Sequence, residues 1–227
     1  MLYILWNIIG IEIAGFASSY AKKFISKAQL QAVLIIANLC IAVVGLQGAI
    51  TTKNNILMIV SCVLGAMIGV RLNLDSKFNQ LGLFLKSKFK TADENFVKEF
   101  ITVFMIQCVG SMAIVGPLNI GLKNDSSILS FKIILDICST LIYGAIYGRS
   151  VMLSGPFVFL YETIIFLLAN ALQPILTPYV INEISAIGSL LIFGMSLDLL
   201  SVIKLKVANY LPALLGPIVY HMITTIS

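Results

Sequence analysis

The sequence predicts an all-α membrane protein, a polytopic bundle of about eight transmembrane helices. Hydrophobic residues make up 59% of the 227 residues, and charged residues only 11%, whereas soluble domains carry roughly a quarter. The mean hydropathy is +1.01. The apolar residues gather in runs, many of which approach the roughly 20 residues that a helix needs to cross a bilayer. Because these runs use up nearly the whole chain, residues 1–227 are expected to form a single transmembrane domain.

The expected spans follow one another with short connections. They cover residues 2–20, 30–50, 55–70, 96–116, 129–148, 151–173, 184–202 and 207–225. No basic segment precedes the first run and no small-residue cleavage site follows it, which favours a retained span over a signal peptide. Ser154-Gly155-Pro156 can break the sixth run, and a re-entrant segment there would leave about seven crossings.

The basic residues indicate the orientation of the chain. They collect in alternate connections, at 21–29, 71–95, 149–150 and 203–206. Short cytoplasmic loops carry an excess of Lys and Arg, so both termini are expected outside the cytoplasm. The net charge of +5 is thus explained by an anionic membrane leaflet, without nucleic acid. Apolar residues at helical spacing, with lysines between them, predict an amphipathic cytoplasmic helix over 72–92.

Short glycine-containing stretches recur along the chain and suggest an internal duplication. Val63–Gly69 (VLGAMIG) is similar to Ile142–Gly148 (IYGAIYG), and Val109–Gly116 (VGSMAIVG) to Ile187–Gly194 (IGSLLIFG). Internal repeats are a recurring plan of secondary transporters, and chance similarity of glycine-rich helices is the alternative. The expected repeat units are 1–50, 55–122 and 129–202.

Glycines four residues apart predict close helix packing at two places. The pairs are Gly65 with Gly69 and Gly144 with Gly148. Small residues at this spacing let two membrane helices approach closely, and such a face can also support a homodimer.

A few ionisable side chains inside the apolar runs carry the functional argument. A charge in hydrocarbon is costly, so Asp136 and Glu162 are expected to face something other than lipid. Lys132 lies four residues before Asp136, so the two can form a structural ion pair; the alternative is a carboxylate that lines a polar cavity. Glu162 has no basic residue nearby in sequence, and a role in proton or cation handling is expected for it.

Asn182 and Glu183 open the seventh run and allow two interpretations. Asn182 suits the N-cap of a helix, and Glu183 suits the positive end of its dipole, without any further function. The alternative is a polar stripe that continues through Ser185. The residues expected along a solute or ion pathway are Asp136, Ser111, Asn182, Glu183, Ser185, Glu162, Asn7 and Asn119.

Several stretches, in order along nearly the whole chain, carry a family resemblance. They are Asn7, LGAMIG (Leu64–Gly69), VGSMAIVG (Val109–Gly116), KIILD (Lys132–Asp136), INEISAIGSLLIFG (Ile181–Gly194) and VANYLPALL (Val207–Leu215). On these the chain resembles the YqgA/YdfK family of bacterial multi-pass membrane proteins, a domain of unknown function. Arg71 and Glu12 depart from the expected pattern. The resemblance implies a bacterial cytoplasmic membrane protein, loosely described as a transporter, and brings no substrate or catalytic residues.

The expected function is a secondary transporter or exchanger of a small polar solute, coupled to protons or cations, with its site between the fourth, fifth and seventh spans. A passive channel and a membrane sensor or scaffold are the alternatives. No enzyme activity, metal or cofactor is expected, because the sequence has no HExxH and no phosphate-binding glycine loop. The expected partners are the lipid bilayer and a small solute or cation.

Overall fold

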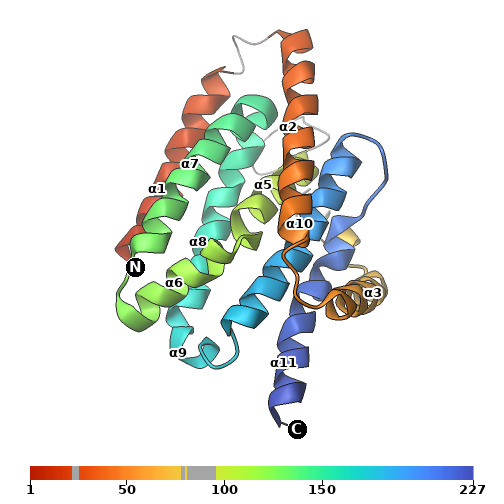
Figure 1. Ribbon diagram of the computed structural model, residues 1–227. Coiled ribbons are helices and arrows are strands. Elements are labelled where there is room, and N and C mark those ends of the chain that lie inside the picture. Colours follow the sequence, from red (N-terminus) through yellow and green to blue (C-terminus); the bar gives the residue numbers. More distant parts are fainter. Residues whose placement is uncertain (22–25, 78–79, 81–95, 227) are drawn as a thin grey trace. The chain divides into compact units, whose positions relative to one another are not determined.

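The computed structural model describes residues 1–21, 26–77, 80 and 96–226, and these residues form helices, turns and short connections without a strand (Figure 1). The all-helical prediction is therefore confirmed for the described residues. The chain divides into two compact units, Met1–Ile36 with Glu94–Gln173, and Ala37–Asp93 with Pro174–Ser227. Helix α2 (Lys27–Ala49) contributes residues to both units. The single transmembrane domain and the three repeat units stay predictions.

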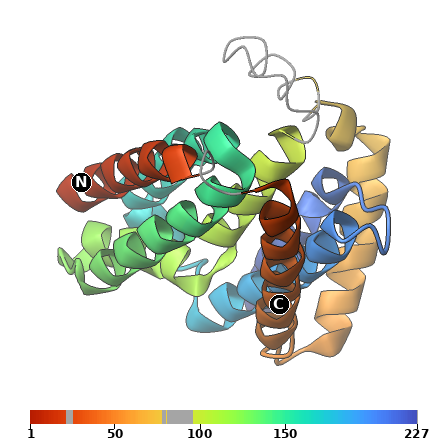
Figure 2. The same cartoon turned by 90° about the horizontal axis from the view of Figure 1, so that it is seen from above.

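The first unit is built around helix α1 (Leu2–Ala21), which runs beside helix α7 (Ser127–Tyr147) in both ribbon views (Figures 1 and 2). Small residues permit this close approach. Gly10 of α1 lies against the side chain of Ile137, and Gly144 of α7 lies against that of Ser18. A third helix, α8 (Ser154–Leu167), also packs against α1. These three helices bring together the polar side chains described below.

The fourth predicted span is divided in the structure. Helix α5 (Phe96–Val109) and helix α6 (Ser111–Lys123) meet at Gly110 with a bend of 51°. The span predicted over 96–116 is therefore broken at Gly110, and its apolar stretch continues to Lys123. Hydrophobicity continues through both helices, so it did not reveal the break. Helix α6 ends where Asn124 adopts a left-handed conformation with φ 54°, which Asn tolerates better than most residues.

The connection between α7 and α8 contains a tight reversal of the backbone. Helix α7 ends at Tyr147 and is capped by Gly148, whose φ of 77° favours glycine. A 3-10 helix, η2 (Gly148–Leu153), follows. Ser154, Gly155 and Pro156 then form the first turn of α8, so the break lies before them. After α8 comes the short helix α9 (Ala169–Leu172).

The second unit contains helix α3 (Asn55–Arg71) packed along the 3-10 helix η3 (Val207–Leu215). Gly65 lies against Ala213, and Gly69 lies against the backbone of Asn209. Helix α11 (Gly216–Ile226) continues from η3. The last predicted span, 207–225, is thus a 3-10 helix followed by an α-helix. Helix α10 (Pro178–Leu199) completes the unit.

The start of α10 corrects one prediction. Its N-cap is Thr177, whose side chain accepts a hydrogen bond of 3.3 Å from the backbone N–H of Val180. Pro178 occupies the first turn, where its missing N–H has no intrahelical partner to lose. The proposed N-cap role of Asn182 is therefore wrong, since this residue lies inside the helix.

The described residues contain four helices that are long and apolar enough to cross a membrane, or five if α5 and α6 form one bent span. The four cover Gln31–Ala49, Ser127–Tyr147, Ser150–Leu167 and Pro178–Leu199. Helices α1 and α3 contain shorter apolar segments, Leu2–Ser18 and Asn55–Arg71. The predicted count of about eight is not confirmed, and most of the amphipathic connector 72–92 lies outside the described residues.

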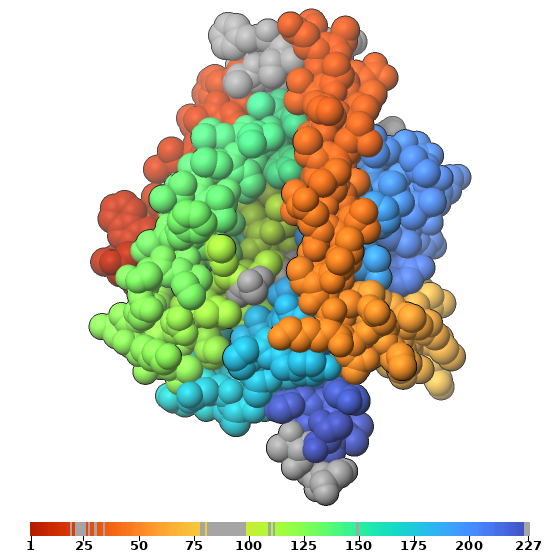
Figure 3. Space-filling view, viewed as in Figure 1, coloured from red at the N-terminus to blue at the C-terminus, as the bar shows by residue number. Residues whose placement is uncertain are grey.

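Helix α7 shows how the apolar residues are used. Its side chains Phe131, Ile134 and Leu135 are exposed, while Lys132 and Asp136 are buried. The helix lies at the surface of the molecule and is green in Figure 3. A helix with polar side chains on its buried side and apolar side chains on its exposed side has the reverse of the distribution found in soluble proteins. It is the pattern expected of a helix whose outer side contacts lipid.

Gly69→Ala is predicted to destabilise the protein. The new methyl group would meet backbone atoms of Asn209, which cannot rotate away. Overpacking of this kind costs about 1–3 kcal/mol, measured as a lower Tm in detergent. Gly110→Ala is the control, because nothing lies within 4 Å of its added Cβ, and a change below about 0.5 kcal/mol is expected. Equal Tm values for the two variants would contradict the packing.

Candidate functional site

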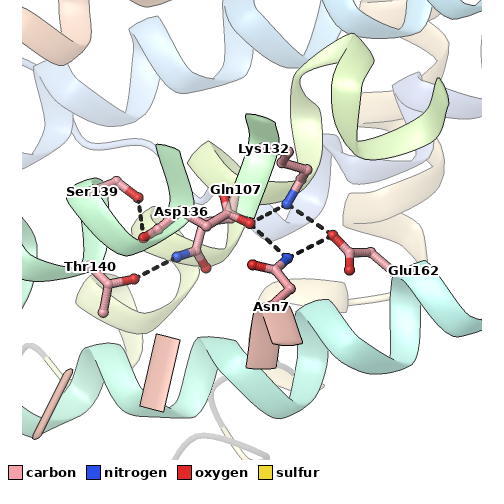
Figure 4. A network of polar contacts seen from close by, with 7 residues as sticks. All are labelled: Asn7, Gln107, Lys132, Asp136, Ser139, Thr140 and Glu162. Carbon is pink, nitrogen blue, oxygen red and sulfur yellow. Dashed lines mark hydrogen bonds and ion pairs between the residues drawn. The ribbon is translucent and has the colours of Figure 1, made fainter. Parts of the chain in front are cut away.

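Four polar side chains from three helices of the first unit meet in its interior (Figure 4). We call them the Lys132 cluster: Asn7 on α1, Lys132 and Asp136 on α7, and Glu162 on α8. Their exposed fractions are 1%, 3%, 4% and 0%, respectively. The cluster therefore places one ammonium group and two carboxyl groups away from both water and lipid.

The contacts of the cluster converge on two oxygen atoms. Lys132 Nζ forms an ion pair with Asp136 Oδ2 and lies 3.0 Å from Glu162 Oε1. The amide nitrogen of Asn7 donates to the same two atoms, at 3.0 Å to Asp136 Oδ2 and 2.9 Å to Glu162 Oε1. An amide has two N–H donors and an ammonium three, so both donors can serve both carboxyl groups.

Regular helix geometry places these groups. Lys132 and Asp136 are one turn apart on α7 and so share a face. Asn7 lies between Ile4 and Ile11 on the buried side of α1, and both isoleucines are fully buried. Ile4 packs with Leu129, and Ile11 packs with Cys108 and Val158. These apolar layers border the cluster along α1, and electrostatic interactions strengthen in such a low-dielectric environment.

Several buried oxygen atoms near the cluster have no hydrogen-bond partner among the described residues. They include Glu162 Oε2 and Asn7 Oδ1 within the cluster. Gln107 donates to Thr140 Oγ1 at 3.0 Å, but its Oε1 is also without a partner. Most buried polar atoms in proteins are hydrogen-bonded. These oxygens can therefore accept a proton, a hydrogen bond or a cation.

The structure brings three of the sequence-predicted pathway residues together, namely Asp136, Glu162 and Asn7. Lys132 is only 3% exposed, because its ammonium group contacts the two carboxyl groups in the interior of the unit. It also supplies the basic partner that Glu162 lacks in sequence. Asn119 is partly buried on α6. Ser111 begins α6, and its side chain lies outside the described part of the chain.

Glu183 has a different environment in the second unit. It is fully buried. Its Oε2 accepts a 2.5 Å hydrogen bond from Thr52 Oγ1, and its Oε1 accepts one of 2.7 Å from the backbone N–H of Lys53. Asn182 donates to Glu183 Oε1 at 3.3 Å and to the carbonyl oxygen of Thr51 at 3.0 Å. Glu183 and Asn182 thus fasten the turn before α3 to helix α10.

Ser185 lies on α10, near Glu183, and its buried hydroxyl oxygen has no partner among the described residues. The predicted pathway residues therefore fall into two groups, one in each unit. Asp136, Glu162 and Asn7 belong to the first unit, and Asn182, Glu183 and Ser185 to the second.

The pathway prediction missed Lys132 as a member of the cluster and missed Thr52 as a partner of Glu183. The spacing of Lys132, Asp136 and Thr140 on one helical face was a usable signal, because it predicts a common polar side. No signal joined Thr52 to Glu183, which lies 131 positions later in the sequence.

Comparison with known proteins places the chain in a family. Residues 3–222 match the model of a family described as protein of unknown function, DUF554. The chain belongs to this family. It is 30% identical over 166 residues to the uncharacterized membrane protein YdfK of Bacillus subtilis (strain 168), a match that covers 73% of this chain and 70% of the relative. It is 31% identical over 164 residues to the uncharacterized protein YqgA of Escherichia coli (strain K12), covering 70% and 69%.

No solved structure is significantly similar to the chain. The family match confirms the resemblance inferred from the sequence motifs. Together with the apolar helices, it identifies a membrane protein. The family's description names no activity, so the geometry of the Lys132 cluster has to support any functional conclusion.

Lys132→Met is predicted to destabilise the protein strongly. It would leave two buried carboxyl groups without their ammonium partner, and breaking a buried ion pair from one side costs about 3–5 kcal/mol. The measurement is the Tm in detergent. The double variant Lys132→Met/Glu162→Gln is expected to lose less, because one of the two carboxyl groups is then gone.

Lys53→Met is the matched control, since Lys53 is exposed, and a change within about 0.5 kcal/mol is expected. If Lys132→Met is as stable as the unmodified protein, the ammonium group does not hold the cluster together.

Proposed function

We propose that the protein is a secondary transporter or exchanger that couples the movement of a small polar solute to protons or cations. The single observation that carries the proposal is the Lys132 cluster, three ionisable groups buried among apolar helices of a membrane protein. Ionisable side chains within transmembrane helices are rare, and they commonly mark ion pathways and proton relays.

Stability alone is a poor explanation for the cluster. Taking charged groups out of water is costly, and apolar residues of similar volume often replace a buried ion pair without loss of stability. The cluster also contains two carboxyl groups but only one ammonium group, so its charges do not balance when both carboxyl groups are ionised. A site that has to bind and release a small positive species accounts for both features.

The proposed roles follow from the contacts. Asp136 and Glu162 bind the coupling ion, and Lys132 and Asn7 keep the two carboxyl groups together by donating to both. The solute contacts expected for Ser111, Asn119, Asn182 and Ser185 stay predictions from the sequence. Glu183 is assigned to holding its turn in place, because both of its oxygens already accept hydrogen bonds.

We also infer the membrane topology from the chain itself. Eight crossings require α1, α3 and the η3–α11 segment to span the bilayer in addition to the longer helices. Helix α1 has 20 residues, which correspond to about 30 Å at 1.5 Å per residue. The distribution of Lys and Arg favours an N-terminus outside the cytoplasm of a bacterial cell.

Cysteine accessibility is predicted to follow this topology. In a background without the native cysteines, Gln173→Cys is expected to react with a membrane-impermeant maleimide in intact cells. Lys204→Cys is expected to react only after the membrane is permeabilised, because the 203–206 connection is assigned to the cytoplasm. Both native residues are exposed. The opposite labelling pattern would overturn the orientation.

Transport is predicted to depend on the two buried carboxyl groups. Purified protein in proteoliposomes is given a panel of amino acids, organic acids, polyamines and simple ions, while solid-supported-membrane currents and internal pH are recorded. We expect a saturable response to one class of solute, lost in Glu162→Gln and Asp136→Asn. Asp125→Asn is the matched control, since this carboxylate is exposed in the α6–α7 connection, and its response is expected to equal that of the unmodified protein.

Other outcomes separate the alternatives. A saturable response that both variants retain would contradict the carboxylate pathway. Conduction without saturation would favour a channel. Silence from folded protein in both readouts would contradict transport and favour a sensor or scaffold.

A further inference from the structure

We propose that the Lys132 cluster holds one exchangeable proton, bound to Glu162, and that this proton is the coupling ion. The second half of this statement rests on the proposed transport function. The first half concerns the cluster alone, and it follows from three observations: the charge count, the contacts of each carboxyl oxygen, and the position of the ammonium group.

The charge count leaves the cluster one positive charge short. Lys132 carries one positive charge, whereas ionised Asp136 and Glu162 would carry two negative charges. The side chains of the three residues are 4%, 6% and 0% exposed, respectively. An isolated charge at such a position is highly unfavourable, and buried groups usually become neutral instead. One additional proton makes the cluster neutral.

The contacts identify Glu162 as the group that carries this proton. Lys132 contacts both carboxyl groups, but Asp136 lies one turn away on the same helix, which favours Asp136 as the ionised member. Glu162 Oε1 receives the contacts from Lys132 and Asn7, but Glu162 Oε2 is buried without a partner. An unpartnered oxygen costs less in a neutral carboxyl group than in a carboxylate. Proton binding at Oε2 removes the uncompensated negative charge from that buried oxygen and leaves a neutral hydroxyl group.

The position of Lys132 disfavours a metal ion in the same role. Its Nζ already occupies the place between Asp136 Oδ2 and Glu162 Oε1, where a cation would gain the most. A metal ion on the remaining oxygens would lie beside this ammonium and be repelled by it. Within the described part of the chain, no group of three or more His, Cys, Asp or Glu residues could hold a metal ion.

The other titratable groups around Glu162 do not alter this count. Cys108 on α5 and Tyr161 on α8 are neutral when protonated, and both pack in the apolar layer around Ile11 and Val158. Glu12 on α1 lies against Gly155, at the first turn of α8, and is partly exposed. Among the described residues, the charged groups of the cluster beside Glu162 are Lys132, which contacts it directly, and Asp136, which shares Lys132 and Asn7 with it.

Infrared difference spectroscopy of the purified protein tests the proton directly, without a solute. A protonated carboxyl group has a C=O stretching band that is distinct from the bands of carboxylates. We expect this band in the unmodified protein at neutral pH, and we expect it to shift in D2O. Carbon-13 labelling of the glutamate carboxyl groups should shift the band, whereas labelling of the aspartate carboxyl groups should leave it in place.

The variants give a sharper test, because the charge count predicts an effect at a distance. Glu162→Gln removes the band by removing the carboxyl group. Asp136→Asn is also expected to remove it, since a single carboxylate then suffices to neutralise Lys132 and Glu162 ionises. Glu183→Gln is the control and should keep the band, because Glu183 belongs to the second unit and makes its hydrogen bonds outside the Lys132 cluster.

Three results would overturn the proposal. They are a band that shifts with labelled aspartate, a band that persists in Glu162→Gln, and the absence of any protonated carboxyl band in the labelled, unmodified protein. These results do not depend on transport. The opposite combination is also informative. If the spectra are as expected but proteoliposomes show no proton-driven response, the bound proton is confirmed and the proposed transport function, with its proton coupling, is contradicted.

Discussion

The simultaneous contact of Lys132 with Asp136 and Glu162 is the interaction on which the interior of the first unit depends. It joins helix α7 to helix α8, and Asn7 adds helix α1 through the same two oxygen atoms. Charged groups are tolerated at this depth only when each has partners. The three helices therefore have to keep their relative positions for the cluster to remain buried.

The two units illustrate opposite ways to bury a glutamate. Both oxygens of Glu183 accept hydrogen bonds, from Thr52, from the backbone N–H of Lys53 and from Asn182. Glu162 has donors on one oxygen only, and its other oxygen has no partner among the described residues. The first arrangement suits a fixed structural link. The second leaves a position at which a proton can bind and leave.

Local patterns predicted the elements that depend on neighbouring residues. The spacing of Lys132 and Asp136 predicted their ion pair, because residues four apart on a helix are always close. The apolar runs predicted the α-helices and their approximate order. The break at Gly110 and the 3-10 helix over Val207–Leu215 were not predicted. The apolar runs continue through both places and so do not reveal them; Gly110 and Pro212 are the local residues that favour a departure from the α-helix.

The sequence by itself determined that this is a helical membrane protein with rare buried charges, since both conclusions need only composition and spacing. The tertiary structure alone decided which charges meet. Asn7 and Glu162 are 155 positions apart, and no local rule relates residues on different helices. It also decided that two glutamates in apolar runs have different partners. Glu183 accepts a hydrogen bond from Thr52, whereas Glu162 contacts Lys132, and the residues themselves do not show this difference.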